Sequence, residues 1–182
     1  MMIEDGTGTG RKAKVNLENL LEVVAVGVDY VRHINVTHNK VWTISLDAVA
    51  PSGATWFAYF YNGGSKIYVF TRIAFASTVA GVFRVAKVTG TPAGGTTITP
   101  SPLNLTSAAL LDLCTVQSGA SITGLTEANL IIPVYLPANQ PVNVESAPGI
   151  VLPPGSGIAI KAPGALTVNG FIEIYEGESD LF

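Results

Sequence analysis

A glycine-rich segment near the start of the chain has the spacing of a phosphate-binding loop. Residues 8–13, Gly-Thr-Gly-Arg-Lys-Ala, fit the pattern G-x-G-x-x-A. The dinucleotide-binding form of this loop needs a strand before it, a helix after it and an acidic residue about twenty positions further on. Only five residues precede Gly6, so we expect no strand there, and a Walker loop would need glycine at Arg11 and Ser or Thr at Ala13. The sequence therefore predicts no nucleotide cofactor.

The two histidines, His33 and His38, are candidate ligands for a transition metal. Their separation of five residues places them on opposite faces of a strand, and a helix would also keep them off a shared face. We therefore expect surface or hydrogen-bonded imidazoles, and no metal or other cofactor. The sequence has no visible Ser, His and acid arrangement and no nucleophile elbow, so we predict that the protein is not an enzyme.

The carboxylates are scattered along the chain, and two of them could still meet in the fold as a glycosidase acid pair. They are Asp29, Asp47, Asp112, Glu127, Glu145 and Glu173. The terminal group Glu176, Glu178 and Asp180 could hold Ca²⁺ if another subunit added oxygen ligands, although a solvated acidic tail is the simpler expectation. Cys114 is the single cysteine and lies in an apolar run, so we expect it to be a small buried residue.

The composition indicates a protein built for assembly. The chain has 182 residues, the length of one domain, and 48% of them are apolar while only 13% are charged. This charged fraction is about half of that usual for a soluble domain, so part of the exterior is expected to lie against other subunits. The net charge of −3 predicts no nucleic-acid partner. Because there is no secretory signal and no apolar run of membrane-helix length, we expect cytoplasmic synthesis and no membrane partner.

The elements that must position these residues read as short strands divided by turn residues. We expect strands at 42–48, 54–61, 66–77, 79–89, 129–136, 142–146, 149–152, 157–161 and 165–175, and one or two helical turns at 108–114. In the third of these strands Ile67, Val69, Ile73 and Phe75 should share one face. Pro133 should lie in an edge strand or at a bulge, because it has no backbone donor.

This spacing predicts an all-β fold, an antiparallel β-sandwich over residues 25–182, behind an extended arm of residues 1–24. Within that class we predict a jelly roll, with an immunoglobulin-like topology as the alternative. Asn62-Gly63-Gly64-Ser65 should supply the positive φ values of a hairpin, and residues 90–95 a flexible tip. The strand at 54–61 is apolar on both faces, so Trp56, Phe57 and Tyr59 are predicted at a subunit interface, although a second sheet covering that face is equally plausible.

The arm carries a family resemblance. The run at residues 5–16, Asp-Gly-Thr-Gly-Thr-Gly-Arg-Lys-Ala-Lys-Val-Asn, is followed by Glu18-Asn19-Leu20 and resembles the amino-terminal signature D-G-T-G-x-G-x-x-A-x-V of tailed-bacteriophage virion proteins, in which this segment precedes a β-domain. The runs at residues 149–160 and 172–176 are also similar to these proteins. Three glycines at every second position suit an arm that a partner orders, because they lose much backbone entropy on folding.

The resemblance implies a structural protein of the virion, often a head decoration or cement protein and sometimes a fibre or tail component. We therefore expect a homotrimer on the capsid surface that binds the major capsid protein through its arm, where strand addition would supply backbone hydrogen bonds. The predicted capsid-binding residues are Gly6, Thr7, Gly8, Thr9, Gly10, Arg11, Lys12, Lys14, Val15, Leu17, Leu20 and Leu21. The alternative is a fibre or tail module that binds carbohydrate or a receptor through aromatic residues between Tyr59 and Tyr68.

Overall fold

The computed structural model describes residues 2–4, 12–14, 40–106, 111 and 113–177, and it separates into the units Met1–Tyr30 and Val31–Phe182. In the first unit, β1 (Met2–Glu4) and β2 (Lys12–Lys14) form an antiparallel ladder in which Met2 pairs with Lys14 and Glu4 with Lys12. The prediction of no strand before Gly6 is therefore wrong. The ladder still lacks the helix that a dinucleotide loop requires, because β2 occupies its place. The predicted boundary after residue 24 lies outside the described residues.

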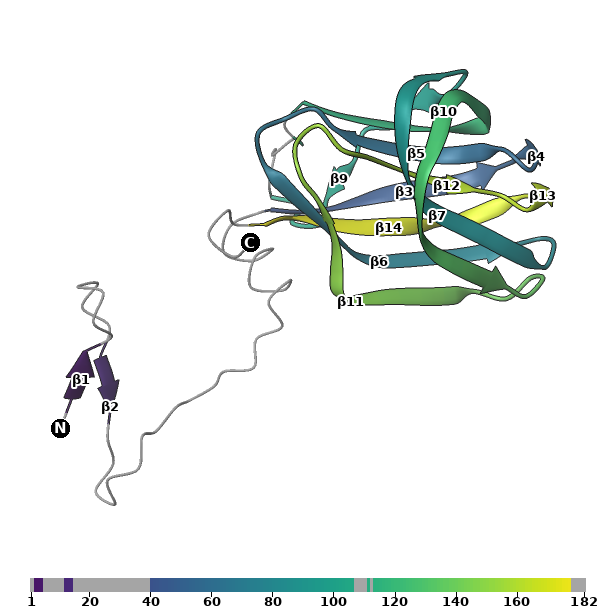
Figure 1. Ribbon diagram of the computed structural model, residues 1–182. Coiled ribbons are helices and arrows are strands. Elements are labelled where there is room, and N and C mark those ends of the chain that lie inside the picture. Colours follow the sequence, from purple (N-terminus) through teal and green to yellow (C-terminus); the bar gives the residue numbers. More distant parts are fainter. Residues whose placement is uncertain (1, 5–11, 15–39, 107–110, 112, 178–182) are drawn as a thin grey trace. The chain divides into compact units, whose positions relative to one another are not determined.

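The second unit contains two antiparallel sheets packed face to face, which Figure 1 shows as two layers. The first sheet has the order β11-β6-β14-β3-β9. Its strands are β3 (Val41–Val49), β6 (Ile67–Ser77), β9 (Ser101–Pro102), β11 (Val142–Leu152) and β14 (Val168–Gly177). The second has the order β5-β12-β7-β10-β8. Its strands are β5 (Trp56–Asn62), β7 (Gly81–Ala93), β8 (Thr96–Thr97), β10 (Cys114–Leu136) and β12 (Gly157–Lys161). A small pair, β4 (Ser52–Gly53) with β13 (Gly164–Ala165), forms a separate two-stranded sheet.

The strand order confirms the predicted all-β antiparallel sandwich and is that of a jelly roll. The chain passes from one sheet to the other between β3 and β5, β5 and β6, and β6 and β7, and again between β10 and β11, β11 and β12, and β12 and β14. Only the connection from β7 to β10 joins two neighbours of one sheet among these eight longer strands. This repeated crossing excludes the immunoglobulin-like alternative.

Aromatic side chains from both sheets fill the space between the layers. Phe57 of β5 meets Phe75 and Phe83 edge to face, with ring centroids 6.2 and 6.0 Å apart. Phe60 makes similar contacts with Tyr68 and Phe70 at 6.0 and 5.2 Å. Each such pair contributes about 0.5–1.5 kcal/mol beyond the apolar area that it buries. The core therefore explains why one face of β5 is so rich in aromatic residues.

A bulge in β6 overturns the predicted alternation of its side chains. Arg72 pairs with Glu173 and Phe70 with Ile174, so Thr71 is an extra residue without an opposite partner. Such a residue moves the following side chains to the other face. Ile73 and Phe75 lie in the core as predicted, but Val69 lies with Val41 and Tyr175 in a separate cluster.

Two further expectations about loops are wrong, and a third is tested only at the described residues. The segment from Asn62 to Ser65 connects strands of different sheets, and neither Gly63 nor Gly64 has a positive φ, because no tight hairpin forms there. Residues 90–93 continue β7 instead of forming a tip, and they pair with β10. Cys114 begins a strand, and no described residue of 108–114 is helical, whereas residues 108–110 and 112 lie outside the described part of the chain.

Candidate functional site

The second sheet carries a groove on its outer face because β10 changes partners along its length. Residues 114–118 and Ile122 of β10 pair with β5, while residues 123–136 pair with β7. β10 therefore passes from one side of the β5-β12-β7 sheet to the other and closes over part of its outer face. A second apolar cluster lies at this face. It consists of Trp56, Tyr59, Ala86, Val88, Ile122 and Ala159.

Two tyrosines of β5 contribute to the groove. Tyr59 and Tyr61 are two residues apart and so point to the same face of the strand. Their rings are nearly parallel, with an interplanar angle of 7° and centroids 6.5 Å apart. Tyr59 is almost fully buried and Tyr61 is half-buried. Burial and the neighbouring Tyr61 raise the pKa of the Tyr59 phenol, so this hydroxyl remains a hydrogen-bond donor at neutral pH.

The walls of the groove add neutral polar groups. β7 contributes residues 88–92 and β10 contributes Thr115 and Gln117, and together with the tyrosines these enclose a volume of about 610 Å³. None of the described residues that line the groove is charged. On the same sheet, Arg84 donates hydrogen bonds to Glu127 and holds the pKa of that carboxyl below its ordinary value, but neither residue lines the groove.

Gln117 has an unsatisfied acceptor in this wall. Its Oε1 atom is buried and has no hydrogen-bond partner among the described residues. A buried acceptor left unpaired costs about 1–3 kcal/mol, so a donor that reaches it would relieve a real penalty. Gln117 lies opposite Tyr59 in the ladder between β10 and β5, so the amide and the tyrosine pair come from neighbouring strands.

Glycines give the groove its depth. A Cβ at Gly157 would lie 3.3 Å from the Tyr59 ring and 3.4 Å from the carbonyl oxygen of Val88. Gly90 lines the groove, and Gly124 of β10 lies against it. Their φ values are +102° and +77°, and a Cβ at Gly90 would lie only 2.2 Å from the Gly124 carbonyl oxygen. β7 and β10 can approach this closely only where both chains lack side chains.

A second surface lies where the two sheets end together. The last part of β10 pairs with β7 alone and β11 pairs with β6 alone, so both are edge strands. Exposed apolar side chains gather on these strands and on β7. They are Val82, Leu130, Ile131, Tyr135 and Val151, and we call this surface the open edge. Ile131 and Val151 line one shallow pocket of about 100 Å³.

The β10 strand of the open edge is poorly suited to backbone pairing with a further strand. Register shifts on either side of Ala128 and Ile131 mark bulges in β10, and Pro133 offers no backbone donor. The prediction for Pro133 is confirmed, because it lies in an edge strand. Side-chain packing, and not strand addition, is therefore the contact that this surface offers.

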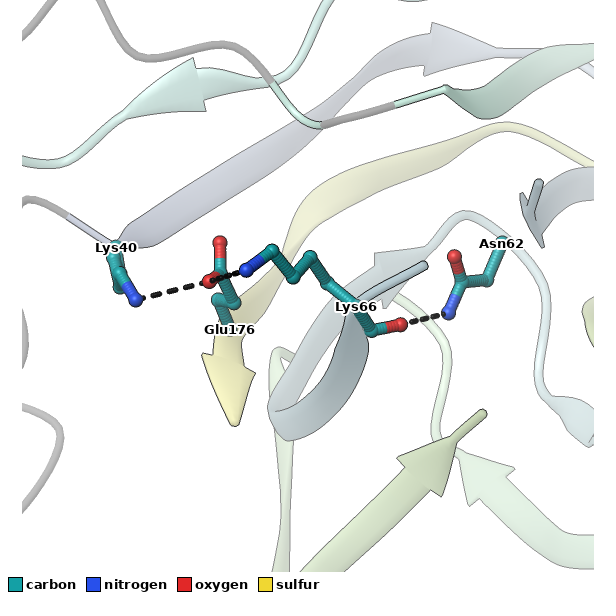
Figure 2. Close-up of polar contacts among 4 residues, drawn as sticks. All are labelled: Lys40, Asn62, Lys66 and Glu176. Atoms are coloured by element: carbon teal, nitrogen blue, oxygen red, sulfur yellow. Dashed lines mark hydrogen bonds and ion pairs between the residues drawn. The ribbon is translucent and has the colours of Figure 1, made fainter. Parts of the chain in front are cut away.

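A polar junction occupies the end of the sandwich near Asn62 (Figure 2). Glu176 Oε1 lies 2.9 Å from Lys40 Nζ and 3.7 Å from Lys66 Nζ. The carboxylate of Glu176 is therefore paired with two cations and only 14% exposed, so the expectation of a solvated acidic tail is wrong at this residue. Glu178 and Asp180 lie outside the described residues.

The predicted site residues fall into two groups. In the arm, the described positions are Lys12 and Lys14, which belong to β2. The others lie outside the described residues. They are Gly6, Thr7, Gly8, Thr9, Gly10, Arg11, Val15, Leu17, Leu20 and Leu21.

The predicted interface residues lie inside the chain's own cores. Trp56, Phe57 and Tyr59 are 8, 0 and 5% exposed. Phe57 packs between the sheets, and the other two lie in the second apolar cluster of the outer face. Their burial is explained by one chain, because the first sheet covers one face of β5 and β10 covers part of the other.

The remaining candidates are the histidines, the carboxylates and Cys114. His33 and His38 lie outside the described ranges, and within those ranges no group of three His, Cys, Asp or Glu side chains could hold a metal ion. Cys114 is half-buried instead of buried, with Sγ 4.0 Å from Asn62 Oδ1. No helix among residues 2–4, 12–14, 40–106, 111 and 113–177 is long and apolar enough to cross a membrane.

Comparison with protein-family models, with curated proteins and with solved structures found no match. The family resemblance therefore rests on the arm and on the carboxy-terminal runs described above. The sequence had indicated the aromatic residues between Tyr59 and Tyr68 as a carbohydrate site, and Tyr59 and Tyr61 of this group line the groove. The parts of the groove that β7 and β10 contribute, and the open edge, were missed from the sequence. The consecutive apolar residues Leu130, Ile131 and Ile132 were the available signal for the edge, because a strand with one buried face would alternate.

Proposed function

We propose that this protein is a bacteriophage virion structural protein that forms a homo-oligomer and decorates and stabilises the capsid through its amino-terminal arm. The observation that carries the proposal is the open edge. It exposes five large apolar side chains on two edge strands and a neighbouring strand, although the sandwich already has a complete aromatic core. Surfaces of this kind mark contacts with other proteins.

The open edge is proposed as the contact between copies of the chain, in place of Trp56, Phe57 and Tyr59. Tyr135 is 63% exposed and lies opposite Val82, which is 49% exposed, so the apolar surface continues from β10 to β7. A trimer would join three such edges. The low charged fraction of 13% supports an exterior that is partly buried in an assembly.

The arm is proposed as the contact with the major capsid protein. Its signature residues belong to a unit separate from the sandwich, and β1 with β2 pairs backbone to backbone at its start. Exposed backbone donors and acceptors of such a ladder could add to a strand of a capsid subunit. Many copies on one shell would make weak individual contacts effective.

Deletion of residues 1–21 tests this proposal. We expect the shortened chain to keep its unfolding temperature and oligomeric state and to lose binding to purified heads of the phage that encodes it. Full-length protein on the same heads is the control, with cryo-electron microscopy to locate its density. Shortened protein that still decorates heads would refute the role of the arm. Density of the full chain on a tail or fibre alone would refute capsid decoration.

A further inference from the structure

We propose that the groove on the outer face of the β5-β12-β7-β10 sheet is a binding site for a neutral carbohydrate, with Tyr61 and Gln117 as its main contacts. This goes beyond the proposed function, because the groove involves neither the arm nor the open edge. Its volume of about 610 Å³ is within the range of small-molecule sites, about 300–1,000 Å³.

The chemistry of the lining selects the ligand class. No described residue of the lining is charged, so these residues offer nothing that would compensate a phosphate, a carboxylate or an ammonium group. Tyrosines combine an apolar ring face with a hydroxyl, which matches a pyranose with its C–H face and equatorial hydroxyls. Thr89, Thr91 and Thr115 add hydroxyls that can both donate and accept. A neutral sugar can pack on the tyrosine rings and form hydrogen bonds with the tyrosine and threonine hydroxyls.

The geometry of the tyrosine pair supports one sugar ring lying beside Tyr61. The ring of Tyr59 is held almost fully buried against Gly157, and the ring of Tyr61 lies nearly parallel to it and is half-buried. The platform is therefore fixed before a ligand binds, which lowers the entropy cost of binding. Gln117 lines the groove from the neighbouring strand. Its Oε1 is buried beside Gly95 and has no partner among the described residues, so it becomes an acceptor for a sugar hydroxyl when the side chain turns toward the groove.

The test is saturation-transfer NMR of the full chain with separate soluble sugars. The neutral probes are the methyl glycosides of glucose, galactose, mannose and N-acetylglucosamine, with maltotriose and chitotriose. The charged comparators are sialic acid and glucuronic acid. We expect at least one neutral probe to bind at concentrations up to about 20 mM and neither acid to bind. No binding of any neutral probe, or binding of the acids alone, would overturn the proposal.

Variants then locate the bound sugar. Tyr61→Ala should weaken binding by about tenfold or more, because it removes the exposed aromatic face. Gln117→Met keeps the length of the side chain and should weaken binding by about threefold while leaving stability unchanged or higher, since it removes an unpaired buried acceptor. Tyr135→Ala, at the open edge, is the matched control and should bind normally, because monovalent sugars do not depend on the number of copies.

A folding control keeps this result decisive. Circular dichroism and thermal unfolding of each variant accompany the titrations. If Tyr61→Ala does not fold, Thr89→Glu replaces it, because Thr89 is exposed and a carboxylate there blocks the groove without removing core contacts. Unchanged affinity in a folded Tyr61→Ala or Thr89→Glu protein would place the sugar elsewhere and overturn the assignment of this groove.

Discussion

The amide of Asn62 is completely buried and joins the connection between β5 and β6 to the end of β11. Its Nδ2 donates to the carbonyl oxygens of Lys66 and Leu152 at 2.7 and 3.0 Å, and its Oδ1 accepts from the Gly64 N–H at 3.2 Å. The bond to Lys66 is drawn in Figure 2. The Asn62 side chain therefore stabilises the connection between β5 and β6, where a turn with positive φ values had been expected. It also holds the end of β11 against the start of β6.

Asn62→Ala should destabilise the sandwich by about 2–4 kcal/mol, because one buried and one partly buried carbonyl and one partly buried N–H lose their partner. Urea unfolding followed by tryptophan fluorescence measures the change. Asn143→Ala is the control, since Asn143 is exposed and accepts only an exposed hydrogen bond from Arg72 Nε among its described contacts, and it should change stability by less than about 0.5 kcal/mol. Equal losses in the two variants would contradict the role assigned to Asn62.

At the scale of elements, the close approach of β7 and β10 determines whether the groove exists. Gly90 and Gly155 both have positive φ, at +102° and +73°, but a Cβ at Gly90 would meet the Gly124 carbonyl oxygen at 2.2 Å while a Cβ at Gly155 would meet nothing within 4 Å. Both positions therefore have a positive φ that is unfavourable for alanine, and they differ most in the space available.

Gly90→Ala should accordingly destabilise the protein by about 2 kcal/mol more than Gly155→Ala, which carries only the cost of positive φ, about 1 kcal/mol. Thermal and urea unfolding of both variants give the difference. Because the clash separates β7 from β10, the Gly90 variant should also lose sugar binding if the groove proposal holds. Similar stability for the two variants would mean that the strands can separate at little cost.

The strands themselves were largely predictable, whereas their pairing was not. Alternation and turn residues located β12 at its observed bounds and β3 to within a residue at each end. β10 was missed as one strand because Gly119 and Gly124 interrupt its pattern and its partner changes from β5 to β7. The groove combines Tyr61 with Gln117 through the sheet order alone, so no local sequence pattern could have located it. The bulge at Thr71 was hidden for the same reason.

At the scale of the whole molecule, the composition predicted that part of the exterior contacts other subunits, but it could not locate that part. Aromatic residues on both faces of β5 drew attention to Trp56, Phe57 and Tyr59, which the chain covers by itself. The exposed apolar residues instead lie on the last part of β10 and on β11, where each sheet has a free edge. A sequence pattern gives the number of apolar faces on a strand, but only the packing of the two sheets decides which face remains open.

Ile131→Glu should break the homo-oligomer, because a carboxylate in a desolvated apolar contact would have no partner and its burial would cost several kcal/mol. Size-exclusion chromatography with light scattering should give a single assembly mass for the natural chain and a monomer for the variant. Leu105→Glu is the matched control, since Leu105 is 93% exposed and lies outside the open edge, and it should keep the assembly. A natural chain that is monomeric, or an Ile131 variant that assembles normally, would remove the open edge from the proposed function. Neither result would bear on sugar binding in the groove, which the NMR titrations test separately.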